Sequence, residues 1–287
     1  MDIKYIDIHS HLGFEDYGTD LKEVIARMKN SEIGTIAVGA DLASSRDAVK
    51  VASENDNVWA CIGQHPTHNM TETESHHGEI GPARPSGAGG FDEVEFEELI
   101  KNPKVVAIGE CGLDYSQISN VEYGVLNEEK ERQKVEFIKQ INFSIKYNKP
   151  LMLHIRNGKI KDEAFDDAYN ILNSIFKIPN STPRGNVHFF TGKLEMAQKF
   201  IDLGFTISFV GLITYVQDFD KIIKNVPLES LQAETDAPYV APVPHRGERN
   251  EPAYVTQVYA KIAEIRGEDP DMVRLQLVKN AKKVFKI

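Results

Sequence analysis

Two histidines stand one residue apart near the start of the chain, within residues 6–11 (IDIHSH). Side chains at positions i and i+2 of an extended strand point to the same face, so His9 and His11 can direct their imidazoles at one point. Imidazole is a common ligand of divalent metal ions. The pair alone is equally compatible with two partly exposed histidines at a strand end. Its meaning depends on ligands supplied by other segments.

Four further metal-capable side chains stand at or near the ends of short apolar runs, namely Glu110, His154, His188 and Asp236. Glu110 lies between Ile-Gly and Cys-Gly, which predicts that it is enclosed. A buried carboxylate without a partner is costly, and a bound cation offsets that cost. Taken singly, His154 is as readily explained as a hydrogen-bonded core histidine.

The apolar runs that precede these residues predict eight β-strands, because most are continuously apolar, as in parallel strands covered on both faces. The expected strands are Tyr5–His9, Thr35–Gly39, Val58–Gly63, Val105–Glu110, Leu151–His154, Val187–Phe190, Phe205–Phe209 and Leu231–Thr235. Amphipathic stretches between them predict helices at Leu21–Met28, Ser44–Asn55, Glu128–Tyr147, Asp162–Phe176, Leu194–Leu203 and Pro252–Arg266, with a last helix from 269–270 to about Phe285. Eight strands alternating with helices predict an α/β fold of the (β/α)₈ TIM-barrel type.

A barrel of this type brings the carboxyl ends of its strands together on one face, where active sites lie. The six candidate ligands follow five different strands, so we expect them to surround one pocket. Six such residues at the same topological position do not arise easily by chance, although each alone has a structural explanation.

Composition limits the function further. The 287 residues are 41% hydrophobic and 26% charged, which is typical of a globular protein, and no apolar run approaches the ~20 residues of a membrane span. No secretory signal is visible, and two cysteines, Cys61 and Cys111, favour a reducing cytoplasm without disulfides. The formal net charge of −10 argues against a broad basic surface for nucleic acid. A polyanionic substrate would need metal ions and a few local Arg and Lys side chains.

Some polar segments have a structural explanation. Residues from Thr67 to about Gly90 are rich in Gly and Pro and predict an irregular loop inserted at about 67–90, in which two adjacent histidines are expected to be exposed. Asn250-Glu251-Pro252 is explained by an N-cap, an acid in the first turn and a proline at the first helical position. Asp114 is a candidate to orient a ligand or its loop.

Seven motifs occur in order along nearly the whole chain. They are D-x-H-x-H-L at 7–12, G-Q-H-P at 63–66, I-G-E-C-G-L-D-Y at 108–115, H-x-R at 154–156, H-x-F-x-G at 188–192, E-T-D-A-P-Y at 234–239 and R-G-x-x-N-E-P at 246–252. With these motifs the chain resembles the TatD family of metal-dependent hydrolases, among the amidohydrolase-like barrels. It departs from the family at Gln64, Cys111 and Thr191 and in the long 67–90 loop, which bears on substrate range more than on chemistry.

The resemblance implies a single hydrolase barrel over residues 1–287 that binds two divalent metal ions. It places His9, His11 and Asp236 on one ion, His154 and His188 on the second, and Glu110 between them. It also implies cleavage of phosphodiester bonds in DNA, as in 3′→5′ exonucleases acting on single strands. Two cations can clamp the attacking and leaving oxygens and supply hydroxide near neutral pH. Asp236, beside that water, is our candidate general base, and Glu110 is the other predicted catalytic residue.

Five residues are predicted to bind substrate. His65 is expected to contact phosphate or to hold an additional metal, with a structural role as an equal alternative. Arg156 and Arg246 are candidates for bidentate phosphate binding, although Arg156 could instead pair with a local carboxylate. Tyr115 and Tyr239 could stack on bases or pack as rim residues.

The leading hypothesis is a cytoplasmic metal-dependent deoxyribonuclease (EC 3.1) with two divalent ions, Mg²⁺, Zn²⁺ or Mn²⁺. Its transient partner is DNA, and neither a membrane nor an obligate protein partner is expected. The alternative is a hydrolase of a small lactone, amide or phosphotriester, which the acidic charge favours slightly and the motifs disfavour. A non-catalytic metal-binding scaffold is a lesser alternative, because none of the six ligands is missing.

Overall fold

The computed structural model describes residues 3–67, 90–116, 118, 123–176 and 185–287. Its eight strands form one parallel sheet in sequence order, and a bridge between Ser10 and Ala237 joins the first strand to the segment after the last. The strands are β1 (Tyr5–Ser10), β2 (Ile33–Val38), β3 (Val58–Ile62), β4 (Val105–Asp114), β5 (Leu151–Arg156), β6 (Gly185–Val187), β7 (Thr206–Phe209) and β8 (Leu231–Ala233). The chain is therefore the (β/α)₈ barrel that the sequence predicts.

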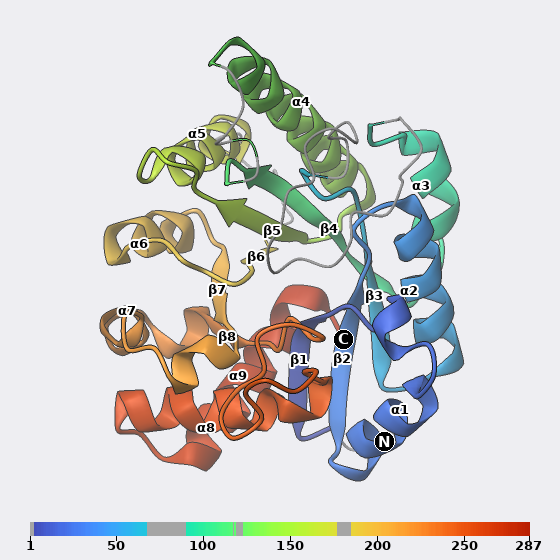
Figure 1. Cartoon of the computed structure of the whole chain (residues 1–287), viewed down its shortest axis with the longest axis vertical. Coiled ribbons are helices and arrows are strands. Elements are labelled where there is room, and N and C mark those ends of the chain that lie inside the picture. Colours follow the sequence, from blue (N-terminus) through green and yellow to red (C-terminus); the bar gives the residue numbers. More distant parts are fainter. Residues whose placement is uncertain (1–2, 68–89, 117, 119–122, 177–184) are drawn as a thin grey trace.

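Helices lie on the outside of this ring and alternate with its strands (Figure 1). The α-helices are α1 (Leu21–Asn30), α2 (Leu42–Glu54), α3 (Glu93–Ile100), α4 (Tyr123–Tyr147), α5 (Glu163–Phe176), α6 (Leu194–Asp202), α7 (Asp220–Asn225), α8 (Val255–Arg266) and α9 (Pro270–Phe285). Short 3₁₀ turns are η1 (Glu15–Tyr17), η3 (Gly211–Thr214), η4 (Leu228–Ser230) and η5 (Pro252–Tyr254). The sequence did not predict α3 and α7, because helices this short show too little of the 3.6-residue period.

Two strands end three or four residues away from the predicted position, whereas the other six end within two residues of it. β6 ends at Val187 rather than Phe190, so His188 follows the strand, and Phe189 turns the backbone with a φ of 44°. β4 continues past Glu110 to Asp114. Gly112 has a φ of +145°, and a Cβ there would meet the carbonyl oxygen of His154 at 2.0 Å, so glycine is required for β4 and β5 to approach this closely. Hydrophobic runs alone do not reveal such backbone features.

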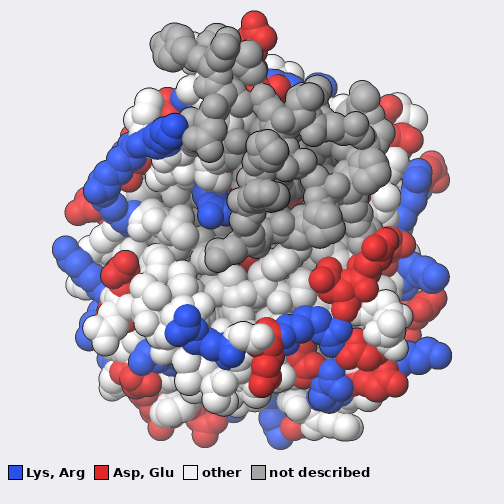
Figure 2. Space-filling view, in the orientation of Figure 1, with Lys and Arg blue, Asp and Glu red and all other residues white. Residues whose placement is uncertain are grey.

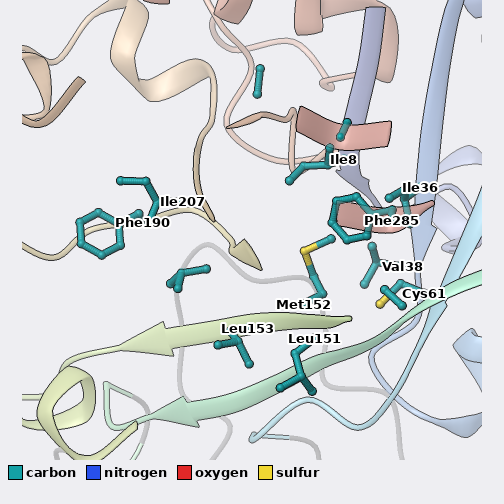
Figure 3. Close-up of a cluster of buried hydrophobic side chains, with 14 of the residues drawn as sticks. Ile8, Ile36, Val38, Cys61, Leu151, Met152, Leu153, Phe190, Ile207 and Phe285 are labelled. Carbon is teal, nitrogen blue, oxygen red and sulfur yellow. The ribbon is translucent and has the colours of Figure 1, made fainter. Parts of the chain in front are cut away.

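The last helix closes the barrel at the amino ends of its strands. The side chain of Asn280 in α9 donates to the carbonyl oxygens of Leu228 and Leu231, at the start of β8. Phe285, at the end of α9, belongs to the same buried cluster as Ile8 and Ile36 (Figure 3). Both cysteines are buried as free thiols within this core. The candidate ligands lie at the opposite end, where the strands have their carboxyl ends.

Two expectations concern other parts of the chain. Of the 67–90 loop, residues 68–89 lie outside the described residues. Within the described part, no helix has both the length and the apolar character that crossing a membrane requires.

Candidate metal centre

Glu110, buried in β4, lies between two groups of histidines and directs one carboxylate oxygen to each. Its Oε2 lies 3.5 Å from Nε2 of His9 and 3.8 Å from Nε2 of His11, both from β1 and the residue after it. Its Oε1 lies 2.6 Å from Nδ1 of His154 and 3.1 Å from Nε2 of His188. A carboxylate that faces two ligand groups with separate oxygens is arranged to bridge two cations.

Asp236 completes the first group. Its Oδ1 lies 3.5 Å from Nε2 of His11 and 3.7 Å from Nε2 of His9, and those two nitrogens are 3.3 Å apart. Asp236 follows β8 with a φ of 54°, a left-handed conformation that Asp tolerates better than most residues. Its amide donates to the carbonyl oxygen of His9 at 2.9 Å, which ties the end of β8 to β1.

Asp7 stabilises this junction between β1 and the segment after β8. Its buried carboxylate accepts hydrogen bonds from the Thr235 amide and hydroxyl, both at 2.8 Å, and from the Thr35 hydroxyl at 3.0 Å. One side chain thus joins β1, β2 and the residues that precede Asp236. Burial raises the pKa of Asp7 to about 8 despite these bonds. We assign Asp7 to holding the ligand strands in place rather than to the pocket itself.

Three of the four imidazoles have an oxygen near the nitrogen that faces away from Glu110, and for His11 and His154 this contact is a hydrogen bond. Nδ1 of His11 contacts the carbonyl oxygen of Val38 at 3.0 Å, and Nε2 of His154 lies 3.1 Å from Oδ2 of Asp114. Nδ1 of His188 lies 3.3 Å from Oε1 of Glu234. An oxygen on the outer nitrogen fixes the ring and its tautomer and raises the basicity of the inner nitrogen, as in metal-bound histidines.

The charges of the centre depend on one another. Burial raises the pKa of Glu110, but the imidazoles of His188, His65 and His154 outweigh burial and hold this pKa well below its usual value. Burial lowers the pKa of His154, but Asp114 and Glu110 oppose it and raise the pKa to about 9. Burial and the nearby His188 lower the pKa of His9. Without a metal Glu110 is thus ionised and His154 holds a proton.

The donor set fits divalent cations. Among the described residues, His9, His11 and Asp236 have ligand atoms that lie within 4.8 Å of one another, and so do Glu110, His154 and His188. These two groups coincide with the two predicted ligand sets. The approach of Nε2 of His9 to Nε2 of His11, at 3.3 Å, suits two rings that present Nε2 to a shared ion. Mixed imidazole and carboxylate donors accept Zn²⁺, Mn²⁺ and related ions without selecting one.

The predicted substrate residues lie at different depths. His65 is buried beside the centre, with Nε2 3.5 Å from Oε1 of Glu110. Tyr239 is partly buried, and its ring lies 6.1 Å from that of His11. Arg156 is exposed at the end of β5, and the Arg246 guanidinium lies 4.1 Å above the Tyr215 ring. Tyr115 is buried, and its hydroxyl donates to Asp167 at 2.8 Å, so it packs below the rim, away from any base.

Two residues differ from the sequence-based interpretation. Asn250 is not an N-cap, because Glu251 holds that position and Pro252 begins η5. The buried Asn250 amide instead donates to the carbonyl oxygens of Thr235 and Tyr239 and holds the loop after β8. Glu234 was not among the predicted site residues. The sequence signal that could have identified Glu234 is a carboxylate directly before Thr235-Asp236, at the end of an expected strand.

Comparison with known proteins agrees with this geometry. The model of the family described as TatD-related DNase matches residues 6–286. The chain is 33% identical over 285 residues to an uncharacterized metal-dependent hydrolase of Bacillus subtilis, covering 98% of each sequence. It is 29% identical to a Klebsiella pneumoniae protein named 3′-5′ ssDNA/RNA exonuclease TatD, covering 98% of this chain and 97% of that protein. The crystal structure of a TatD homologue from Escherichia coli superposes with a TM-score of 0.79 at 26% identity, over 100% of both chains.

Proposed function

The chain belongs to the family of TatD-related DNases and is a metal-dependent hydrolase, and from this premise we propose that it cleaves phosphodiester bonds of single-stranded DNA from the 3′ end. The observation that carries the proposal is the division of the two Glu110 oxygens between the two ligand groups. Two adjacent cations are the arrangement that many nucleases use to cleave phosphodiester bonds. The relative named as an exonuclease supports the choice of substrate.

We assign six residues to two divalent ions. His9, His11 and Asp236 would hold one ion, His154 and His188 would hold the other, and Glu110 would contribute an oxygen to each. When bound, the ions lower the pKa of a coordinated water and neutralise charge on the phosphate oxygens. Their identity is Mg²⁺, Zn²⁺ or Mn²⁺, since all three accept nitrogen and oxygen donors.

The protein's own groups orient the reaction. The ionised Asp236 carboxylate faces the pocket beside His11 and accepts the proton of the attacking water. His65 lies beside Glu110, close enough to contact an oxygen of a phosphate bound at the metal centre. Arg156 stands outside on the rim and binds the next phosphate of the strand. Tyr239 lines the entrance next to His11.

Substitution of the central carboxylates tests this assignment. Glu110→Gln and Asp236→Asn are expected to reduce release of nucleotides from a labelled 12-nucleotide strand by at least about 10³-fold, since each loses a ligand charge. Glu229→Gln makes the same chemical change as Glu110→Gln at an exposed residue of η4 and serves as the control. Circular dichroism must show the wild-type fold in all three. Wild-type nuclease activity in both carboxylate variants would refute the two-metal assignment.

The remaining candidate reaction uses the same centre on a small molecule. A panel of lactones, amides and phosphotriesters, assayed beside the DNA strand, separates the two. Turnover of the panel without release of nucleotides would replace the nuclease proposal. Loss of DNA cleavage on chelation, with recovery on addition of Mg²⁺, Mn²⁺ or Zn²⁺, would support it.

A further inference from the structure

The segment between β5 and α5, residues 157–162, which we call the β5–α5 loop, is fixed at both ends. The Asn157 side chain accepts a hydrogen bond from the amide of Ala164 at 3.0 Å, which closes the loop on the first turn of α5. Asp162 pairs with Lys193 at the start of α6. Glu163 accepts two hydrogen bonds from Lys130 of α4, at 2.7 and 2.8 Å. The loop therefore projects from a rigid base.

The tip of this loop is Lys159-Ile160-Lys161, and it faces solvent. Ile160 is 58% exposed, and both flanking lysines are exposed. Neither lysine forms an ion pair with any residue that the structure describes, whereas the nearby Lys130 and Lys193 are both paired. Among the described residues, the structure shows no partner through which the charges of Lys159 and Lys161, or the exposed Ile160 side chain, would stabilise the fold.

The tip stands on the rim that carries the candidate metal centre. Arg156 ends β5 two residues after His154, and three further residues span at most about 10 Å. Lys159 therefore lies within that distance of Arg156. In Figure 2, Lys and Arg side chains extend along the side of the molecule where Figure 1 places α5, with acidic side chains beside them, and α5 itself carries Glu163, Asp166 and Asp167.

We propose that the tip of the β5–α5 loop binds the nucleic acid strand beyond the phosphate that is cleaved. Lys159 and Lys161 contact two backbone phosphates, and Ile160 packs against a base or sugar between them. The inference rests on the proposed nuclease function. A chain with a net charge of −10 repels a polyanion at long range, so local cations of this kind are needed to hold it.

The test compares the double variant Lys159→Ala/Lys161→Ala with a matched control, Lys282→Ala/Lys283→Ala. The control removes two exposed lysines from the last turn of α9, at the opposite end of the barrel. Equilibrium binding of a 12-nucleotide DNA strand is measured at several salt concentrations with Ca²⁺ in place of a catalytic ion. The ratio of kcat/KM for the strand to that for bis(p-nitrophenyl) phosphate is measured with Mn²⁺.

Each lysine–phosphate contact on a single strand contributes about 0.7 to the slope of log affinity against log salt. Loss of two contacts should lower this slope by about 1.4 and raise Kd about 25-fold at 0.1 M salt. The kcat/KM ratio should fall to a similar extent. Ile160→Ser should raise Kd less and leave the salt slope unchanged, because the side chain carries no charge.

Equal salt slopes and ratios for the loop variant and the α9 variant would overturn the inference while leaving the nuclease proposal intact. An unchanged slope combined with loss of binding to anionic lipid vesicles would assign the tip to a membrane surface and would likewise overturn it. If the wild-type protein cleaves neither the strand nor the diester, the proposed function itself fails. These outcomes are therefore distinguishable.

Discussion

Glu234 offers the sharpest test of how the centre is built, because its carboxylate lies beside the ring nitrogen of His188 that faces away from Glu110. Its Oε1 lies 3.3 Å from Nδ1 of His188 and accepts a hydrogen bond from the Phe189 amide at 2.6 Å. The side chain is fully buried. We expect Glu234→Gln to weaken metal binding at the His154–His188 group selectively.

The magnitude follows from this contact. Two unit charges 3.3 Å apart attract by about 5 kcal/mol at an effective dielectric constant of about 20. Glutamine retains a carbonyl dipole at the same place, and desolvation of the carboxylate offsets much of the rest, so the net loss is smaller. Outer partners of metal-bound histidines contribute about 10- to 100-fold in affinity, or about 1.4–2.7 kcal/mol. The expected loss in this variant lies in that range.

Competition with a chromophoric chelator measures both Zn²⁺ affinities, and metal analysis after gel filtration gives the stoichiometry. The variant should retain one tightly bound ion and lose the other, whereas the control Glu229→Gln should bind two. Two ions bound with wild-type affinity by Glu234→Gln would refute the reasoning. Equal weakening of both ions would show that Glu234 supports the barrel as a whole rather than His188.

Three other outcomes are expected. The pKa of His154 is raised to about 9, so this ring holds a proton that a metal must displace. Metal affinity should therefore rise by at least about tenfold per pH unit from pH 7 to pH 8.5, because the pKa of His188 is also raised by Glu234 and Glu110. Calorimetry in buffers of different ionisation heat measures this rise, and a flat profile would contradict it. Gly112→Ala should lower the free energy of unfolding by at least about 2 kcal/mol in urea titrations, because the Cβ of the alanine would meet the His154 carbonyl oxygen at 2.0 Å. An unfolding midpoint equal to that of the wild type would show that β4 can shift. Arg156→Ala should raise KM for the DNA strand about tenfold with a smaller effect on kcat, whereas an equal loss in kcat would place Arg156 at the cleaved phosphate.

The amino-acid sequence by itself determined the barrel and the identities of the predicted ligands. Continuous apolar runs in alternation with amphipathic stretches specify parallel strands covered by helices, and that topology brings the carboxyl ends of the strands to one face. His9 and His11 share a strand face through a local rule that needs no tertiary contact. The motifs around Glu110 and Asp236 then indicated the family.

Only the tertiary structure decided how those residues meet. The division of the Glu110 oxygens between two groups depends on how β4 lies against its neighbours, and Gly112 permits the close approach to β5. Glu234 and Asp7 both stand in the motifs, but the residues that they contact lie far away in the chain and the sequence does not show which they are. Tyr115 and Tyr239 each end one of the motifs, yet the Tyr115 ring packs beneath Lys130 and the Tyr239 ring lies 6.1 Å from that of His11. Burial and partner geometry are properties of the assembled barrel, so sequence patterns fix which residues are available and packing fixes what each can do.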